Sequence, residues 1–200
     1  MVDKPSAREA KRLQTRERLM GAAIAEFKRS GMAEADVGAV VAAAGVAHGT
    51  FFFHFPTKEH VLLELERREE DRMAKQFGLF LQSNDDLAAA LNESVRLVLG
   101  LERRLGDVLF KDFLALHFSQ TRPPAEGGQD HSLVVLLAKQ IETFRARGDL
   151  DAEVNSLNSA VFFLLGLYAL AITTNDPMRR ELLDDLVKRT LRSMAVPGRA

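Results

Sequence analysis

The residues best suited to a chemical task lie between Gly45 and Lys58, in the run Gly-Val-Ala-His-Gly-Thr-Phe-Phe-Phe-His-Phe-Pro-Thr-Lys. Histidine side chains can donate hydrogen bonds to guanine N7 and O6, and threonine can contact a phosphate or the methyl group of thymine. Glycine lets a backbone approach a partner closely because it carries no side chain. This combination of residue types favours contact with DNA.

Two short helices must position these residues. Residues 37–44 are rich in alanine and valine and predict a helix with Asp36 as its N-cap. The capping box is half missing, because the partner position holds Ala39. Gly45 can adopt the left-handed conformation that ends a helix, and a second helix is expected over residues 47–54. This is the layout of a helix-turn-helix, whose second helix enters the major groove of DNA.

Helical periodicity extends along the chain, with no alternating strand pattern and no internal repeat. In residues 8–30, Leu19, Ala23 and Phe27 recur at four-residue spacing and predict one buried face, which Gly31 ends. Six further helices are expected over about residues 58–81, 86–105, 106–119, 131–147, 151–174 and 177–195, with a Pro- and Gly-rich loop at 121–130. The predicted fold is therefore all-α with about nine helices.

We expect two domains that divide inside a continuous helix. Residues 1–60 form the predicted helix-turn-helix domain with a basic N-terminal arm, and residues 61–200 form the remaining helical domain. Residues 1–30 carry a net charge of +4, which leaves −5 for the rest of the chain. A basic arm can neutralise phosphates, although residues 1–8 are equally well interpreted as a solvated tail.

Composition excludes several functional classes. The chain has no cysteine, which excludes disulfides and thiolate metal sites, and its five histidines lack metal-ligand spacing. We find no nucleophile–base pair, no paired carboxylates and no phosphate loop, so neither catalytic residues nor a metal or cofactor are expected. No signal peptide is visible, and the longest apolar run, 160–172, falls short of the ~18 residues of a membrane span. A cytoplasmic protein is expected.

The spacing of glycine and apolar residues is kept across three helices. The positions are Leu19–Phe27, Gly31, Val37, Val40, Val41, Gly45–Phe52, Phe55 and Lys58. In these residues the segment 16–62 resembles the N-terminal domain of the TetR family of transcriptional regulators. The resemblance implies that Lys58 contacts a phosphate, and that the rest of the chain binds a small effector and dimerises.

The sequence departs from the family pattern at Ala35, Ala47 and Phe52, where the family usually has Thr, Ser and Tyr. Each change removes a hydroxyl group. Since a neutral hydrogen bond contributes on the order of 1 kcal/mol, the three losses together could weaken DNA binding tenfold to a hundredfold.

Helix geometry divides the second helix of the motif into two faces. Phe51 and Phe55 share a face and are expected to be buried, whereas His48, Thr50, Phe53 and His54 are expected to point outward. The predicted DNA-binding residues are Ala47, His48, Gly49, Thr50, Phe52, Phe53, His54 and Lys58. Alternatively, the two histidines could be ordinary surface residues and the three phenylalanines could belong to the core. However, three consecutive residues cannot all face one side of a helix.

The C-terminal helices carry many aromatic residues and a few polar residues in apolar settings. The predicted effector-binding residues are Phe77, Phe110, Phe113, His117, Phe144, Asn158, Phe162 and Tyr168. Together they make an apolar pocket plausible, although each one taken singly is more often plain core.

Two apolar stripes predict a dimer interface. They comprise Val154, Leu157, Val161, Leu164, Tyr168 and Ala171 in the eighth helix, and Leu183, Leu186, Val187, Thr190 and Met194 in the ninth. Two such helices from each of two chains can form a four-helix interface, although the same stripes could pack within one chain.

The function predicted from the sequence is a ligand-responsive homodimeric transcriptional repressor, which binds a palindromic DNA operator and releases it when an apolar effector binds. The alternative is a helical small-molecule-binding or scaffold protein with weakened DNA binding. The missing hydroxyl groups favour that alternative.

Overall fold

The structure is a computed structural model that describes residues 6–119 and 131–198. Within those residues the chain forms nine helices and no strand, which confirms the predicted all-α fold. The helices are α1 (Ala7–Glu34), α2 (Val37–Ala44), α3 (His48–His54), α4 (Lys58–Ser83), α5 (Leu87–Leu105), α6 (Asp107–His117), α7 (Ser132–Ala146), α8 (Ser156–Thr173) and α9 (Met178–Ser193). The loop expected at 121–130 lies outside the described residues.

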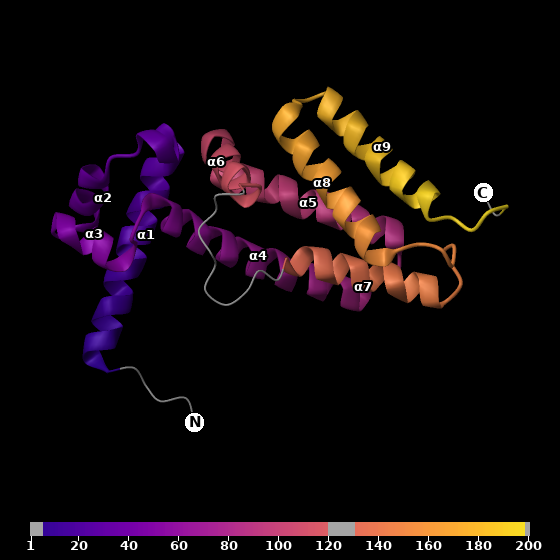
Figure 1. The fold of residues 1–200 in the computed structure, drawn as a ribbon, viewed down its shortest axis with the longest axis horizontal. Helices are drawn as coiled ribbons and strands as arrows, with labels where there is room; N and C mark the ends of the chain where they lie inside the picture. Colours follow the sequence, from indigo (N-terminus) through magenta and orange to yellow (C-terminus); the bar gives the residue numbers. More distant parts are fainter. Residues whose placement is uncertain (1–5, 120–130, 199–200) are drawn as a thin grey trace. The chain divides into compact units, whose positions relative to one another are not determined.

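The helices form two compact units. The first unit contains Met1–Glu66 and Leu105–Pro124, and the second contains Arg67–Arg104 and Ala125–Ala200. In the first unit α2 and α6 pack on α1, and α3 packs on α2 (Figure 1). In the second unit α7 and α9 both pack on α8. The division of roles at residue 60 stays a prediction.

Helix α1 is long and closed at both ends by local signals. Ser6 caps it, because the Ser6 hydroxyl accepts from the Glu9 amide while the Glu9 carboxylate accepts from the Ser6 amide at 2.8 Å. The helix is interrupted at Gly31, whose φ of 79° is accessible to glycine at little cost. Leu19 and Phe27 are buried in α1 as predicted.

Helix α8 begins later than predicted. Residues 151–155 precede the helix, with a turn at 152 and 153. The Asn155 side chain accepts the amide of Asn158 at 2.9 Å, so Asn155 rather than Asp151 caps the helix. The Asp151 carboxylate instead accepts the amide of Glu153 at 2.9 Å and closes a local turn. Both residues are good caps, and the sequence alone did not distinguish them.

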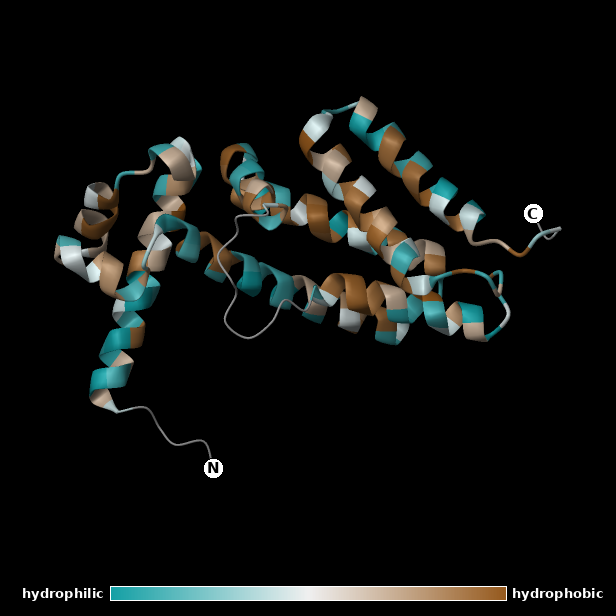
Figure 2. Cartoon of the chain, viewed as in Figure 1, coloured by the Kyte–Doolittle hydropathy of each residue, from teal (hydrophilic) through white to brown (hydrophobic). Residues whose placement is uncertain are grey.

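Helix α8 is the most apolar helix of the second unit (Figure 2). A side-chain carbon at Gly166 would lie 3.1 Å from Leu186, so the glycine permits a close approach of α9. At its start, the buried Ser156 hydroxyl donates to Glu142 of α7 at 2.7 Å. The helix is long and apolar enough to cross a membrane by length and composition, with mean hydropathy 1.7. One such helix is weak evidence for a span, because core helices share these properties.

Candidate DNA interface

Helices α2 and α3 form a helix-turn-helix in which local hydrogen bonds define both ends of α2. The Asp36 carboxylate caps α2 by accepting the amides of Gly38 at 2.7 Å and Ala39 at 3.2 Å. At the other end Gly45 is left-handed, with φ 63° and ψ 43°. The two helices are bent by 96° across this turn, which is the angle typical of the motif. The predicted N-cap and the predicted turn are both confirmed.

Helix α3 has one buried and one exposed face. Phe51 and Phe55 are almost fully buried, and their ring centroids lie 6.0 Å apart. Phe52 is 48% exposed and Phe53 is 73% exposed, which is unusual for such large apolar side chains. The exposed face also includes Ala47, His48 and Gly49, with Thr50 half-buried. Six of the predicted DNA-binding residues therefore lie on or beside one accessible surface.

The N-terminus of α3 lacks a side-chain cap. Ala47 occupies the N-cap position with an extended backbone, and only its carbonyl contributes, accepting the Thr50 amide at 2.9 Å. The position has no hydroxyl group to accept the amides of the first turn. The chain also lacks the hydroxyl groups that the TetR family usually has at positions 35 and 52. Ala35 is buried and Phe52 is exposed.

His54 does not point outward as the sequence analysis expected. Its side chain is buried, with 9% exposed, because residue 54 lies at the edge of the face that carries Phe51 and Phe55. Burial, followed by the charges of Arg16 and Arg12, lowers the pKa of the His54 imidazole below its ordinary value of 6.5. The ring packs edge-on against Phe53. His54 is thus placed to support α3 from the inside, and its lowered pKa favours the neutral imidazole.

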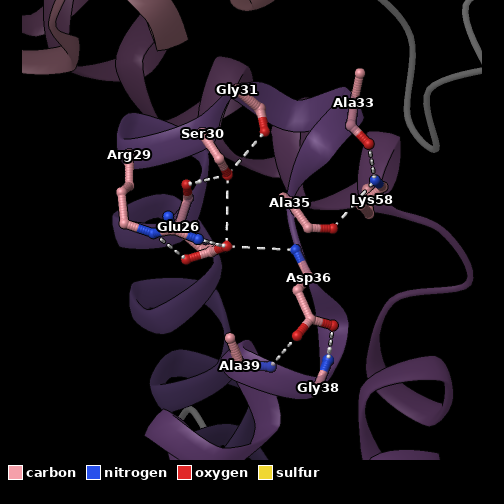
Figure 3. Close-up of polar contacts among 10 residues, drawn as sticks. All are labelled: Glu26, Arg29, Ser30, Gly31, Ala33, Ala35, Asp36, Gly38, Ala39 and Lys58. Carbon is pink, nitrogen blue, oxygen red and sulfur yellow. Dashed lines mark hydrogen bonds and ion pairs between the residues drawn. The ribbon is translucent and has the colours of Figure 1, made fainter.

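Lys58 is the first residue of α4, and its side chain binds the turn between α1 and α2. Its ammonium group donates to the carbonyl of Ala33 at 2.7 Å and to that of Ala35 at 3.3 Å (Figure 3). The phosphate contact implied by the resemblance would require Lys58 to leave these carbonyls or to share its protons with a phosphate.

Glu26 is a positioning residue that sequence reasoning missed. Its carboxylate accepts the backbone amide of Asp36 at 3.3 Å, which is the bond that the partner of a capping box normally makes (Figure 3). Arg29 holds that carboxylate in place through bonds of 2.9 and 2.5 Å, and it is the main cause of the lowered pKa of Glu26. A residue from α1 therefore completes the box that Ala39 leaves open.

The predicted effector-binding residues divide between the two units. Phe110, Phe113 and His117 belong to the first unit, where the two phenylalanines are buried and the His117 ring is hydrogen-bonded to Glu66. The other five belong to the second unit: Phe77 is buried, Phe144 and Tyr168 are half-buried, and Asn158 and Phe162 are exposed. The open depression on the second unit, lined by residues of 138–157, includes none of the eight.

Comparison with known proteins agrees with this geometry. A family model described as bacterial regulatory proteins of the tetR family matches residues 19–65. No curated protein matches the chain. Many solved structures share the fold, at sequence identities that establish the fold alone.

Three of these structures illustrate the likeness. The fatty acid degradation regulator FadR from Bacillus halodurans is 17% identical, with a TM-score of 0.61 over 88% of this chain and 97% of that one. CprB from S. coelicolor A3(2) is 22% identical, with a TM-score of 0.60 over 93% and 92%. RolR, solved with the ligand resorcinol, is 20% identical, with a TM-score of 0.65 over 95% and 92%.

The match extends from Leu19 in α1 through α2 and α3 into α4, and the helical fold that follows is shared along nearly the whole length of the solved structures. The chain therefore carries the N-terminal domain of the TetR family of bacterial regulators, on the fold of TetR-family proteins.

Proposed function

We propose that this protein is a ligand-responsive transcriptional repressor that binds a palindromic operator as a homodimer and has no catalytic activity. The observation that carries the proposal is the accessible face of α3, which presents His48, Gly49 and Phe53 around a half-buried Thr50. A helix of this motif enters the major groove with such a face.

Each side chain on this face has a contact that its chemistry suits. His48 would donate to guanine N7 or O6, and Thr50 would contact a thymine methyl group or a phosphate. Phe52 and Phe53 would pack on thymine methyl groups or on sugars, which would explain why these large apolar side chains are exposed in the free protein. At Gly49 no atom lies within 4 Å of where a side-chain carbon would be, so the backbone is open to close approach.

A homodimer through α8, with α9 beside it, is supported by an exposed apolar stripe. Phe162, Leu165 and Ile172 are 70%, 45% and 38% exposed, and with Ala169 they follow alternating spacings of three and four. In the stripe predicted from the sequence, Leu164 and Ala171 are buried and Leu157 is 54% exposed, while the other three residues are half-buried. We therefore assign the contact to the outer stripe of α8, because such a patch typically marks an interface.

An effector in the second unit would act by a population shift. It must bind one spacing of the two helix-turn-helix motifs better than the other, since equal affinity for both would shift nothing. The binding of resorcinol by RolR, which shares the fold, supports an aromatic or apolar small molecule as the class of effector. We place the protein in the cytoplasm, where its DNA partner would be.

The second candidate function is a small-molecule-binding protein whose DNA binding is weak. The uncapped start of α3 at Ala47 favours it, because a recognition helix of seven residues depends strongly on its ends. The two candidates differ in whether α3 binds DNA specifically.

A mobility shift on the DNA upstream of the protein's own gene, at defined salt and with excess nonspecific DNA, tests the proposal. We expect a shift that survives the competitor, and expect the double variant His48→Ala/Thr50→Ala to lose it. Sedimentation of the variant is the control. Loss of the dimer in the same variant, or no competitor-resistant shift of the unaltered protein, would contradict the assignment of α3.

A further inference from the structure

Each of the three helices in the helix-turn-helix region ends at carbonyl groups that bind a basic side chain from elsewhere. Lys58 of α4 donates to Ala33 and Ala35 at the end of α1. Two arginines of α1 complete the set, since Arg18 donates to Ala44 and Gly45 at the end of α2, and Arg16 donates to His54 at the end of α3.

Helix ends explain why these contacts are favourable. The last carbonyl groups of a helix have no partner within it, and the helix dipole places partial negative charge there. A lysine or arginine supplies both donors and positive charge, and charge-assisted hydrogen bonds are about twice as strong as neutral ones. In α2 and α3, which have eight and seven residues, most residues lie within one turn of a helix end.

Side chains bind both the amide groups and the carbonyl groups of the turn after α1. Asp112 of α6 accepts the Met32 amide at 2.6 Å, and Glu26 accepts the Asp36 amide, while Lys58 binds the carbonyls between them. Gly31 belongs to the same arrangement, because a side-chain carbon there would lie 3.4 Å from Asp112. Acidic side chains thus bind the amides and a basic side chain binds the carbonyls.

The two arginines are held by more than one contact. The Arg16 guanidinium lies 4.1 Å from the centroid of the Phe55 ring and 3.8 Å from a carboxylate oxygen of Glu64. For Arg18, the fit is close at the turn, since a side-chain carbon at Gly45 would lie 3.0 Å from its guanidinium. Both guanidiniums therefore lie against the turn and helix ends that define the orientation of α3.

We propose that Lys58, Arg16 and Arg18 are positioning residues for DNA binding, which hold the three helices in register and do not themselves neutralise phosphates. The inference rests on the proposed function. Phosphate neutralisation then falls to the exposed basic residues of the first half of α1. Arg12 is the best placed of these, because its guanidinium lies 6.0 Å from the ring of the outward-facing Phe53.

Salt dependence separates a phosphate contact from a positioning role. Affinity falls with rising salt with a slope of about 0.9 per neutralised phosphate, so removing one such contact lowers the slope by about 1. The probe is a labelled duplex that the unaltered protein selects from a random-sequence library. We expect Lys58→Gln to weaken binding about tenfold at every salt concentration with no change of slope. The matched variant Arg12→Gln is expected to lower the slope by about 1. A fall of about 1 in the slope of Lys58→Gln would overturn the proposal.

Hydrogen exchange in the free protein gives a second readout that needs no DNA. In Lys58→Gln the amides of residues 32–40 should exchange faster than in the unaltered protein, and Lys58→Arg should restore slow exchange. If Lys58→Gln fails to fold, Arg18→Gln provides the same test, and it should speed exchange at residues 42–50. Unchanged exchange in both glutamine variants would contradict the positioning role. Failure of the unaltered protein to select DNA would refute the proposed function, whereas the exchange measurements would still test the positioning role of Lys58 and Arg18.

Discussion

The two units of the molecule use charged side chains differently. In the first unit, Glu26, Arg18 and Arg16 bind backbone groups at the ends of the short helices α2 and α3. In the second unit, charged residues mostly pair with one another, as in Arg147 with Asp85 at 2.6 Å and Arg145 with Glu142 at 2.6 Å. Arg179 does both, since it pairs with Glu102 at 2.8 Å and donates to the carbonyl of Thr174 at the end of α8.

Helix length accounts for this contrast. The helices α2 and α3 have eight and seven residues, whereas α5 and α8 have 19 and 18. Short helices are marginal by themselves and depend on their caps, whereas long helices are stabilised by packing along a face. A helix that contacts DNA must also leave one face free of packing contacts, so contacts at its ends have to fix its position. The contrast leads to four predictions.

The largest effect should come from burial in the second unit. Phe163→Ala removes a phenylalanine that is 1% exposed in α8, and should lower the free energy of unfolding by about 3–5 kcal/mol. Its neighbour Phe162, 70% exposed, is the matched control, and Phe162→Ala should change the stability of the monomer by less than about 0.5 kcal/mol. Urea unfolding at low protein concentration measures both. Equal losses would show that packing along a face does not dominate this unit. Sedimentation of Phe162→Ala should reveal a weaker dimer.

An intermediate effect should follow the loss of a cap. Asp36→Ala removes the N-cap of α2 and should cost about 1 kcal/mol of local stability. Asp86→Ala is the matched change in the second unit, since the Asp86 carboxylate accepts the Ala88 amide at 2.8 Å at the start of α5. Hydrogen exchange should accelerate across all of α2 in the first variant, and only in the first turn of α5 in the second. Acceleration confined to the first turn of α2 would remove the distinction between short and long helices.

Acid should affect both units through carboxylates whose pKa is lowered. The hydrogen bonds from Arg145 and Ser156 lower the pKa of Glu142 from 4.5 to about 2. Because the unfolded chain protonates first, the stabilisation by Glu142 is complete above pH 4.5 and is lost as the pH falls from there to about 2. Glu142→Gln should flatten the pH dependence of stability in this window, measured by urea unfolding. An unchanged pH dependence would show that Glu142 does not contribute in this way.

In the first unit, the bond from Arg29 lowers the pKa of Glu26, so acid should release the Asp36 amide below the ordinary range of a glutamate. Exchange at this amide, followed by NMR against pH, should show the release, and it should be absent from Glu26→Gln.

The smallest effect should come from restoring a hydroxyl group. Ala47→Ser supplies the missing side-chain cap of α3 and should stabilise the helix by about 0.5–1 kcal/mol. It should also raise DNA affinity several-fold. Ala47→Gly is the control, because it alters the backbone without supplying an acceptor. An effect of Ala47→Ser no larger than that of Ala47→Gly would show that the end of α3 does not limit binding.

Local signals made much of the fold predictable. Asp36, Gly31 and Gly45 each act within a few residues of their own position. Asp36 as N-cap and Gly45 as turn were predicted correctly, whereas Gly31 interrupts α1, which continues to Glu34, instead of ending it. Helical periodicity correctly placed His48 and Phe53 on the exposed face of α3, whereas Thr50, also expected there, is half-buried and His54 is buried. That residue lies at the edge of the buried face, where periodicity does not decide.

Contacts between distant residues could not be predicted in the same way. The bond from Asp112 to Met32 joins residues 80 positions apart, and Lys58 reaches carbonyls 23 and 25 positions away. No spacing in the sequence encodes such pairs, because they depend on how the helices pack. The same holds for α8, where apolar residues surround the helix and the sequence did not show which stripe faces outward.

The central claim is that α3 reads a specific DNA sequence. Selection of bound duplexes from a random-sequence library, with the unaltered protein and with the His48→Ala/Thr50→Ala variant, tests it most directly. The account predicts that the unaltered protein enriches one palindromic sequence, and that the variant enriches none while remaining dimeric. Enrichment of no sequence by the unaltered protein, or of the same sequence by the variant, would contradict it.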